Sequence, residues 1–267
     1  MRFITTYKSK KELELEKIFF KQGYIIGNIK DKSLFKNYEK EFLKIVSQVS
    51  KIRKNKLVLE NFHKLIPPSK INDIRVNIFK KFNKNKWLLP TYYYFAKEIL
   101  DIIVGNEICI QKQINLSIQM PNDQSSMLSI HADSFNGESP YQVVLWIPIV
   151  NAYKTNSMFI LNPNDNKKLI NEMKQFKQKE GLNKIYKKYE KKFKFLNVKK
   201  GQYVIFSSNL LHGNTINKEK HSRWSFNTRV KSLFSPYNSF EKSIGNFYQP
   251  KLIKPATICG LNFDKPE

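Results

Sequence analysis

Apolar residues in the first hundred positions are spaced as in amphipathic helices. Four segments share this spacing: residues 10–23, 31–52, 71–82 and 89–104. The first stops at Gly23, and the second opens on Asp31, a residue type that caps helix N-termini. Pro90 starts the fourth and Gly105 ends it. We therefore expect a mainly helical N-terminal region. Its aromatic run TYYYF, residues 91–95, is expected to pack in a core rather than form a binding stripe.

The period changes to two from about residue 107 onwards. Runs of β-branched and aromatic residues alternate there and are bounded by Pro, Asn, Gly and Ser. They cover residues 107–120, 141–150, 157–161, 202–206 and 222–234. An earlier short run, YIIGNI at residues 24–29, has the same composition. Many short strands after a helical start predict an α+β, mainly β chain: a β-sandwich or barrel buttressed by helices.

The chain length of 267 residues fits a single domain, residues 1–267. We expect helical support over residues 1–105, a β-rich core over 106–235 and an irregular C-terminal segment, 236–267, that wraps the domain. A lysine-dense helical pattern with sparse apolar positions interrupts the core at residues 165–193. A solvated helical insertion is the favoured interpretation of this segment, and a lid over a site is the alternative.

The formal net charge of +25 raises the possibility of a nucleic-acid partner. Only five of the 47 basic residues are arginines, however, which leaves 42 lysines spread along the chain. Base readout and bidentate phosphate contacts favour arginine. A coding bias from an AT-rich genome would give the same composition, so nucleic acid is not the expected partner. An acidic or phosphate-bearing small molecule, or an anionic membrane surface, remains compatible with the charge.

The two cysteines, Cys109 and Cys259, form neither a metal-spaced pair nor a disulfide framework. No apolar run approaches the roughly 20 residues of a membrane span, and the N-terminus does not have the pattern of a secretory signal. A reducing cytoplasm is the expected compartment.

The four histidines contain the first candidate chemistry. His131 and Asp133 lie two residues apart, and in extended backbone such residues project from the same face. His212 follows the apolar strand at residues 202–206 and could supply a third ligand. Two imidazoles and one carboxylate form the facial triad of non-haem Fe(II) sites. Taken alone, His131 would more simply be a surface or core histidine. His63 and His221 have no partner at metal spacing; His221 stays a minor candidate at the pocket rim.

A second cluster lies on the strand at residues 222–234. Alternation places one polar set on one face: Arg223, Ser225, Asn227 and Arg229. Such a face is costly to bury without an anion. The guanidinium fork of Arg223, 11 residues beyond His212, suits the far carboxylate of a 2-oxoglutarate co-substrate. Arg229 fits either a substrate anion or a surface ion pair.

Five elements, in order along nearly the whole chain, resemble the phytanoyl-CoA hydroxylase-like group of Fe(II)/2-oxoglutarate-dependent oxygenases. They are EKIFFKQGYIIGNI, HAD, VVLWIPIVNAYKTNSMFILNPND, KKGQYVIFSSNLLHGN and the arginine 11 residues past the distal histidine. HADSFNGESPYQVVLWIPIV and KTNSMFIL are similar, more narrowly, to a bacterial subgroup encoded sporadically in carbohydrate-biosynthesis clusters. The loop KTNSM departs from the family, which usually carries glycine where Asn156 stands.

The resemblance implies a double-stranded β-helix (jelly roll, cupin-like) with Fe(II) held by His131, Asp133 and His212. Arg223 would bind 2-oxoglutarate, and Trp146 would line the co-substrate pocket unless it is only a core residue. The resemblance also suggests weaker contacts, to co-substrate or substrate: Gln119, Ser129, Asn227 and Arg229.

The implied activity is O2-dependent hydroxylation of a small molecule, with a carbohydrate or sugar-linked metabolite of surface-glycan biosynthesis as the expected substrate. Asp133 favours hydroxylation because related halogenases lack this carboxylate. The loop SFNGESPYQ, residues 134–142, is expected to face the substrate. Three alternatives stay open: an oxygenase acting on an amino acid or lipid, a non-catalytic jelly-roll protein that binds a metal or ligand, and a basic nucleic-acid-binding protein.

Overall fold

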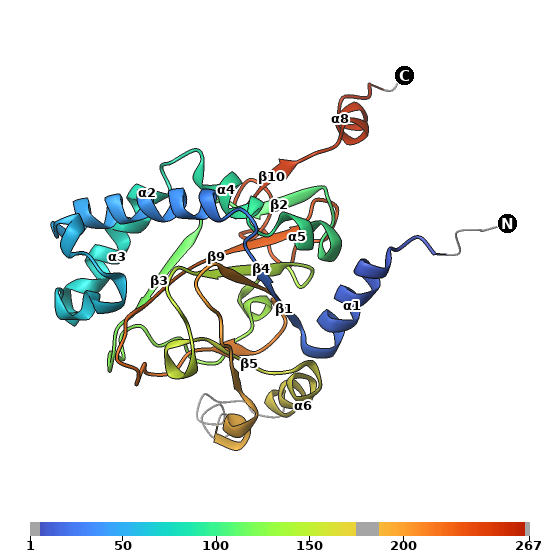
Figure 1. The fold of residues 1–267 in the computed structure, drawn as a ribbon. Helices are drawn as coiled ribbons and strands as arrows, with labels where there is room; N and C mark the ends of the chain where they lie inside the picture. The colour runs from blue at the N-terminus through green and yellow to red at the C-terminus, as the bar shows by residue number, and fades with distance from the viewer. Residues whose placement is uncertain (1–5, 175–186, 265–267) are drawn as a thin grey trace.

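The computed structural model describes residues 6–174 and 187–264. Its helices are α1 (Lys10–Gln22), α2 (Lys32–Ser50), α3 (Pro68–Phe82), α4 (Leu88–Tyr94), α5 (Lys97–Ile103), α6 (Pro163–Met173) and α8 (Pro255–Leu261). Its strands are β1 (Tyr24–Asn28), β2 (Ile108–Gln111), β3 (Asn115–Gln119), β4 (Val143–Pro148), β5 (Phe159–Ile160), β6 (Lys194–Phe195), β7 (Gln202–Ser207), β8 (His212–Gly213), β9 (Arg223–Ser232) and β10 (Tyr248–Leu252). The expected order of helices followed by strands is confirmed (Figure 1).

Local capping signals set the ends of the first two helices. The Ser9 hydroxyl accepts from the Glu12 backbone N–H, and the Glu12 carboxylate accepts from Ser9 N–H, so α1 starts in a capping box. Gly23 ends α1 in the left-handed region at φ 76°, where a side chain would also overlap Leu210. The Asp31 carboxylate caps α2.

The helix predicted over residues 89–104 is wrong in one respect, because it is two helices, α4 and α5, that meet at Phe95 and Ala96. Tertiary contacts on α4 override the helical period here. The Tyr92 hydroxyl donates to the carbonyls of Leu145 and Phe226, and the Phe95 ring packs edge-on against α2. As predicted, this aromatic run contributes mainly to the core.

The strands form two antiparallel sheets. The larger sheet has the order β1-β7-β4-β9-β2-β10, with β3 also paired to β9, and the smaller sheet has the order β6-β5-β8. The single strand predicted over residues 107–120 is two strands, β2 and β3, which pair with opposite ends of the long strand β9. The predicted fold class, a jelly roll buttressed by N-terminal helices, is confirmed.

The two faces of the larger sheet pack against different elements: the N-terminal helices cover one face and β5 lies against the other. On one face, Trp224 and Phe226 of β9 pack in an aromatic core with Phe42 of α2 and Phe82 of α3. On the other face, a second apolar cluster joins the larger sheet to β5: Val144, Trp146, Val204, Phe206, Met158 and Ile160. The alternation of β9 therefore turns its polar residues away from the helices and towards the space between the sheets.

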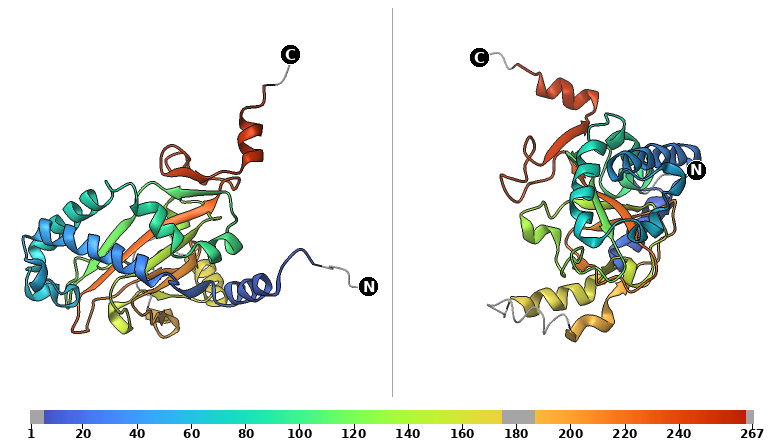
Figure 2. Two further views of the ribbon diagram at one scale, coloured as in Figure 1. Left: turned by 45° about the horizontal axis from the view of Figure 1, so that its top comes forward. Right: turned by 90° about the vertical axis from the view of Figure 1, so that its left-hand side faces the viewer.

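The helical segment after β5 begins as predicted with α6, which packs Leu169 against the body. The Asn166 side chain also bonds the backbone of Asn209 and Leu211, directly before β8. The expected helical insertion at residues 165–193, for which a lid was the alternative, includes residues 175–186, which lie outside the described residues. At the C-terminus, β10 joins the edge of the larger sheet, and α8 then extends away from the body (Figure 2).

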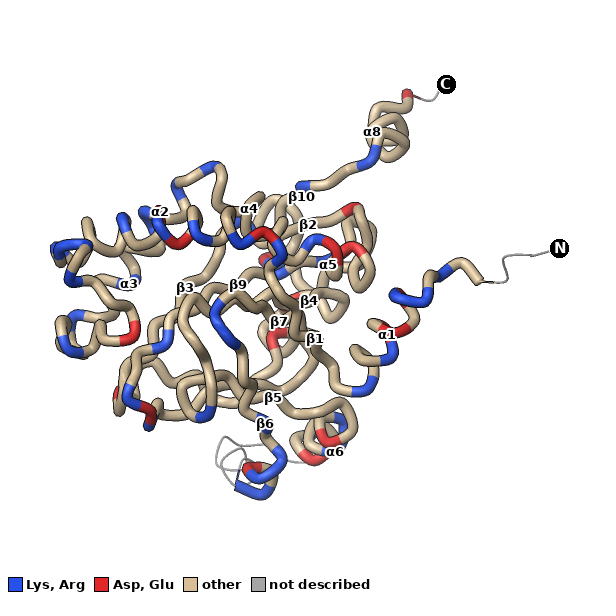
Figure 3. Tube along the Cα trace, viewed as in Figure 1, with Lys and Arg blue, Asp and Glu red and all other residues tan. Residues whose placement is uncertain are grey.

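Basic residues are spread over several elements, among them α1, α2, α3 and the segment beside β6 (Figure 3). None of the helices within the described ranges is long and apolar enough to cross a membrane.

Candidate metal centre

Two paired backbone segments bring His131 and His212 together. The His131 N–H donates to the His212 carbonyl at 3.0 Å, and the His212 N–H donates back to the His131 carbonyl at 2.9 Å. This antiparallel bridge sets the two rings 4.4 Å apart, centre to centre. Asp133 follows two residues after His131, at the start of a short 3-10 turn, with its carboxylate buried. Residues separated by more than 75 positions therefore form one cluster, as the sequence predicted.

The imidazole rings are oriented by backbone carbonyls. His131 Nδ1 donates to the Ser129 carbonyl at 2.7 Å, and His212 Nδ1 donates to the Leu210 carbonyl at 2.8 Å. These bonds leave both Nε2 atoms facing Asp133 Oδ1, at 3.6 and 3.9 Å. One ligand atom from each residue lies within 4.8 Å of the others. The arrangement offers two nitrogen ligands and one oxygen ligand to a single ion.

Gly213 is required by the close approach of the loop that carries His131. A side-chain carbon at this position would lie 2.8 Å from the Leu128 carbonyl oxygen, 2.9 Å from the Phe159 ring and 3.2 Å from the Ser129 carbonyl oxygen. The His-Gly pair seen in the sequence is therefore a steric requirement of the site itself.

The charge state of the cluster suits metal binding. Burial lowers the pKa of His212 to about 4, which keeps its ring neutral and its Nε2 lone pair available near neutral pH. Burial alone would raise the pKa of Asp133, but the charge of Arg229 and the hydrogen bonds that Arg229 donates lower it below its usual range. Asp133 is therefore held as a carboxylate, although it is only 2% exposed.

Arg229 forms a buried ion cluster with two carboxylates. Its Nη2 donates to Asp133 Oδ1 at 2.9 Å, and its Nε lies 3.2 Å from Asp133 Oδ2 and 3.1 Å from Glu138 Oε2. Its Nη1 donates to Asn227 Oδ1 at 2.7 Å. Arg229 is thus an ion-pair partner, with 13% of its side chain exposed, whereas its two carboxylate partners are buried. The pattern of the sequence did not indicate Glu138, which lies in a loop without periodicity.

A cavity of about 80 Å³ leads from the three candidate ligands to Arg223. Val144, Trp146, Met158 and Phe206 line its apolar side. Trp146 packs in the apolar cluster between the sheets and also lines this cavity.

Arg223 is buried, and its hydrogen-bond partners are neutral. It donates to the hydroxyls of Ser117 and Ser225 at 3.0 and 2.6 Å, to Gln119 Oε1 at 3.2 Å and to the Asn156 carbonyl at 3.1 Å. Within the described ranges no carboxylate forms an ion pair with it, and burial lowers its pKa to about 10. A buried cation with no counterion is costly, so this end of the cavity suits an anion.

Several polar side-chain atoms around Arg223 also lack a hydrogen-bond partner among the described residues. The Asn156 side-chain nitrogen and the Ser157 and Thr215 hydroxyls are buried without a hydrogen-bond partner among the described residues. Asn156, where the family that the sequence resembles usually carries glycine, contributes its backbone carbonyl to Arg223. The departure therefore leaves the environment of Arg223 intact.

The remaining candidates lie at different distances from the cavities. Gln119 is buried and contacts Arg223, while its amide nitrogen donates to the Thr215 carbonyl. The Ser129 side chain is exposed and lines neither cavity beside the candidate ligands, so only its carbonyl takes part, through His131. His63 bonds Ser222, and His221 is exposed. Neither of these histidines lines the cavities beside the candidate ligands.

A larger cavity, of about 640 Å³, opens on the other side of His131 and Asp133. Its walls come from α3, β3, β9 and residues 125–128. The loop at residues 134–142 contributes Asn136 and Glu138 to it. Asn227 lines both cavities and accepts from Arg229 and from Asn115.

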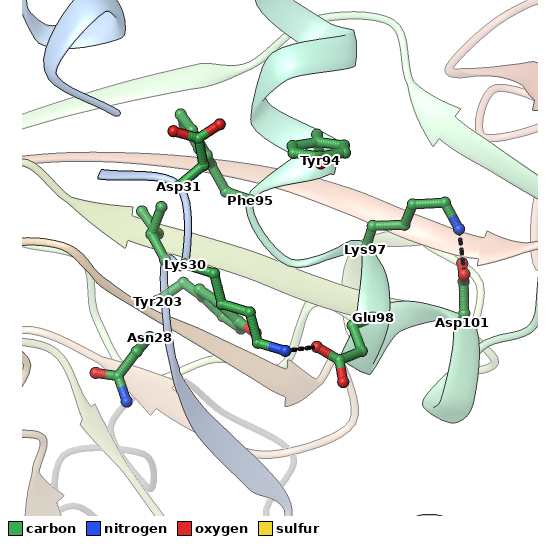
Figure 4. A pocket seen from close by; sticks show the side chains of 10 residues that line it. Asn28, Lys30, Asp31, Tyr94, Phe95, Lys97, Glu98, Asp101 and Tyr203 are labelled. Atoms are coloured by element: carbon green, nitrogen blue, oxygen red, sulfur yellow. Dashed lines mark hydrogen bonds and ion pairs between the residues drawn. The ribbon is translucent and has the colours of Figure 1, made fainter. Parts of the chain in front are cut away.

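A further recess, of about 390 Å³, lies where β1 meets α5 (Figure 4). Its buried wall includes Tyr203. Two of its carboxylates have lysine partners: Glu98 is paired with Lys11 and Lys30, and Asp101 with Lys97. The third, Asp31, caps α2. The recess includes none of the candidate metal ligands.

No family model and no curated protein matches this chain. Several solved structures are similar to it. The non-heme monooxygenase ThoJ, in a complex with nickel, has 15% identity and a TM-score of 0.57 over 91% of this chain and 85% of that one. AviO1 from Streptomyces viridochromogenes Tue57 has 13% identity and a TM-score of 0.53 over 88% of this chain and 100% of that one. EvdMO1 has 12% identity and a TM-score of 0.52 over 84% of this chain and 50% of that one. The chain therefore has a double-stranded β-helix fold, shared with the non-heme monooxygenase ThoJ.

Proposed function

We propose that this protein is a Fe(II)- and 2-oxoglutarate-dependent oxygenase that hydroxylates a small molecule. One observation carries the proposal: three candidate metal ligands and a buried arginine line the same small cavity, and no carboxylate among the described residues pairs with that arginine. A metal-binding protein without catalysis would need the first feature but not the second.

The residues present fit both groups. His131, Asp133 and His212 would hold the iron and leave part of its coordination open on the cavity side. Arg223 would hold the far carboxylate of 2-oxoglutarate, with Ser117 and Ser225 orienting its guanidinium. When bound, iron and 2-oxoglutarate supply the reaction with O2 that oxidises a C–H bond and releases succinate and CO2. Trp146, Met158 and Phe206 exclude water from the co-substrate side.

We further propose that the substrate is a carbohydrate or a sugar-linked metabolite of surface-glycan biosynthesis. Two observations support this class: the resemblance of HADSFNGESPYQVVLWIPIV to the carbohydrate-cluster subgroup, and the side chains of the larger cavity. Amide and hydroxyl groups recur there, on Asn72, Asn115, Ser125, Asn136 and Asn227, and they match the hydroxyls of a sugar. An amino acid or a lipid is the rival substrate class. The neighbouring genes discriminate between them, because glycosyltransferases or sugar-nucleotide enzymes would favour the sugar.

The activity is tested by incubating the purified protein with Fe(II), 2-oxoglutarate and O2 and measuring succinate. We expect slow formation of succinate without substrate, and its loss in His131→Ala.

Arg223→Gln should weaken 2-oxoglutarate binding on the order of 10- to 100-fold, since it removes charge-assisted hydrogen bonds. His221→Ala, at an exposed histidine outside the cluster, is the matched control and should behave as the wild type. Absence of succinate together with absence of metal-dependent 2-oxoglutarate binding would leave the non-catalytic binding protein as the better account.

A further inference from the structure

The larger cavity has an inner and an outer end. Its inner end is formed by His131 and Asp133, which it shares with the small cavity between the candidate ligands and Arg223. Its outer wall is the face of α3 that carries Ile71, Asn72 and Arg75. A molecule that fills this cavity therefore reaches from α3 to two of the candidate metal ligands, His131 and Asp133.

The basic residues that line this cavity are arginines, whereas most basic residues of the chain are lysines. The protein has 42 lysines among 47 basic residues, yet the described residues that line the cavity include no lysine and two of the five arginines. A composition bias towards lysine does not explain that choice. Arginine offers a planar fork for carboxylate or phosphate oxygens, which lysine lacks.

The two arginines have different surroundings. Arg229 is compensated at the inner end by Asp133 and Glu138. The hydrogen bond of Arg75 is to a neutral group, Asn72 Oδ1, at 2.8 Å. In the part of the chain that the structure describes, no acidic residue forms an ion pair with Arg75, whose side chain is only partly exposed. The α3 wall of the cavity therefore has one positive charge that pairs with no acidic residue in the described ranges and donates a hydrogen bond to Asn72.

Glu138 apart, the remaining side chains of the cavity are uncharged, and polar groups alternate with the apolar side chains of Leu116, Ile118, Met127 and Leu128. Asn115, Ser117 and Asn227 come from the paired strands β3 and β9, and Ser125 and Ser126 from the loop opposite. The Ser126 hydroxyl is buried and has no hydrogen-bond partner among the described residues. Such groups satisfy hydroxyls or amides and leave a second charge on the ligand without a partner.

We propose that the larger cavity binds a substrate with one terminal anionic group, a carboxylate or a phosphate, which Arg75 holds at the end remote from the metal. The neutral, hydroxyl- or amide-bearing part of the substrate lies against Asn115 and Asn227 and presents its reacting carbon to the metal side. This inference rests on the proposed function, since it defines the substrate class of that same site.

The test measures equilibrium binding to the full chain loaded with Mn(II) and 2-oxoglutarate, without O2. The probes are glucose, glucuronate and glucose 6-phosphate, with acetate and inorganic phosphate as the isolated anions. We expect at least one anionic probe to bind more tightly than glucose, and Arg75→Gln to weaken that binding on the order of 10- to 100-fold. Arg75→Lys should restore part of the affinity. Arg53→Gln, at an exposed arginine on another element, is the matched control and should bind as the wild type.

The preferred anion assigns the ligand: tighter binding of glucuronate and acetate indicates a carboxylate, and tighter binding of the two phosphates indicates a phosphate. Equal binding of glucose and the anionic probes, no binding by any of them, or full affinity in Arg75→Gln would overturn the inference. Failure of the proposed function has a different signature, because the wild type would then not bind 2-oxoglutarate in a metal-dependent manner at all.

Discussion

Gly213→Ala is expected to weaken metal binding without touching any ligand side chain. The added carbon would meet the Leu128 carbonyl oxygen at 2.8 Å and the Ser129 carbonyl oxygen at 3.2 Å, whereas ordinary contacts begin at 3.4 Å. The loop must therefore move by about 0.6 Å to bring the Leu128 carbonyl oxygen to an ordinary contact distance. Ser129 is the acceptor that orients His131, and residue 213 itself follows His212 directly. Both imidazoles are consequently disturbed by one methyl group.

The expected loss of metal affinity follows from the displacement of the Ser129 carbonyl, which orients His131. Loss of a group that orients a ligand typically costs about 10- to 100-fold in metal affinity. Overpacking of a filled site costs about 1–3 kcal/mol of folding free energy. The assay is a titration of the apoprotein with Mn(II), together with urea unfolding of the apoprotein. Gly260→Ala is the matched control, because a side-chain carbon there meets nothing within 4 Å. A Gly213→Ala protein with wild-type metal affinity would refute the steric reasoning.

Two further predictions concern buried groups. Glu138→Gln leaves Arg229 with Asp133 as its remaining carboxylate partner, and we expect a loss of about 1–3 kcal/mol in urea unfolding; an unchanged unfolding midpoint would show that Glu138 does not compensate Arg229. Cys109 is buried, and burial raises the pKa of its thiol, whereas Cys259 is exposed. A thiol reagent at mildly alkaline pH should therefore modify Cys259 alone in the native protein and both cysteines after unfolding, and rapid modification of both before unfolding would contradict the packing around β2.

The parts of the fold that were predictable from the sequence depend on short-range signals. Gly23 and Asp31 mark helix ends because they act on the adjacent backbone. The alternation of β9 placed Arg223 and Trp224 on opposite faces, and the structure has them there. The break between α4 and α5 was not predictable, because contacts with α2 and the larger sheet produce it.

The residues of the candidate site also include some that the sequence predicted and some that it did not. His131, Asp133 and His212 stand in short patterns whose chemistry is visible in the sequence. Glu138 was missed because its partner Arg229 lies 91 positions away in the sequence. Arg75 was missed because only the folded chain brings it to the same cavity as His131 and Asp133, although the rarity of arginine was a usable signal for it. Ser129 was predicted to act through its side chain. In the structure its backbone carbonyl accepts the hydrogen bond from His131 instead, and a backbone contact of this kind leaves no signal in the residue type.

The measurement that tests the central claim most directly is a crystal structure of the protein grown with Mn(II) and 2-oxoglutarate. The account predicts one metal ion held by Nε2 of His131, Nε2 of His212 and the Asp133 carboxylate. It also predicts the far carboxylate of 2-oxoglutarate on Arg223. A metal ion bound elsewhere, or 2-oxoglutarate bound away from Arg223, would contradict it.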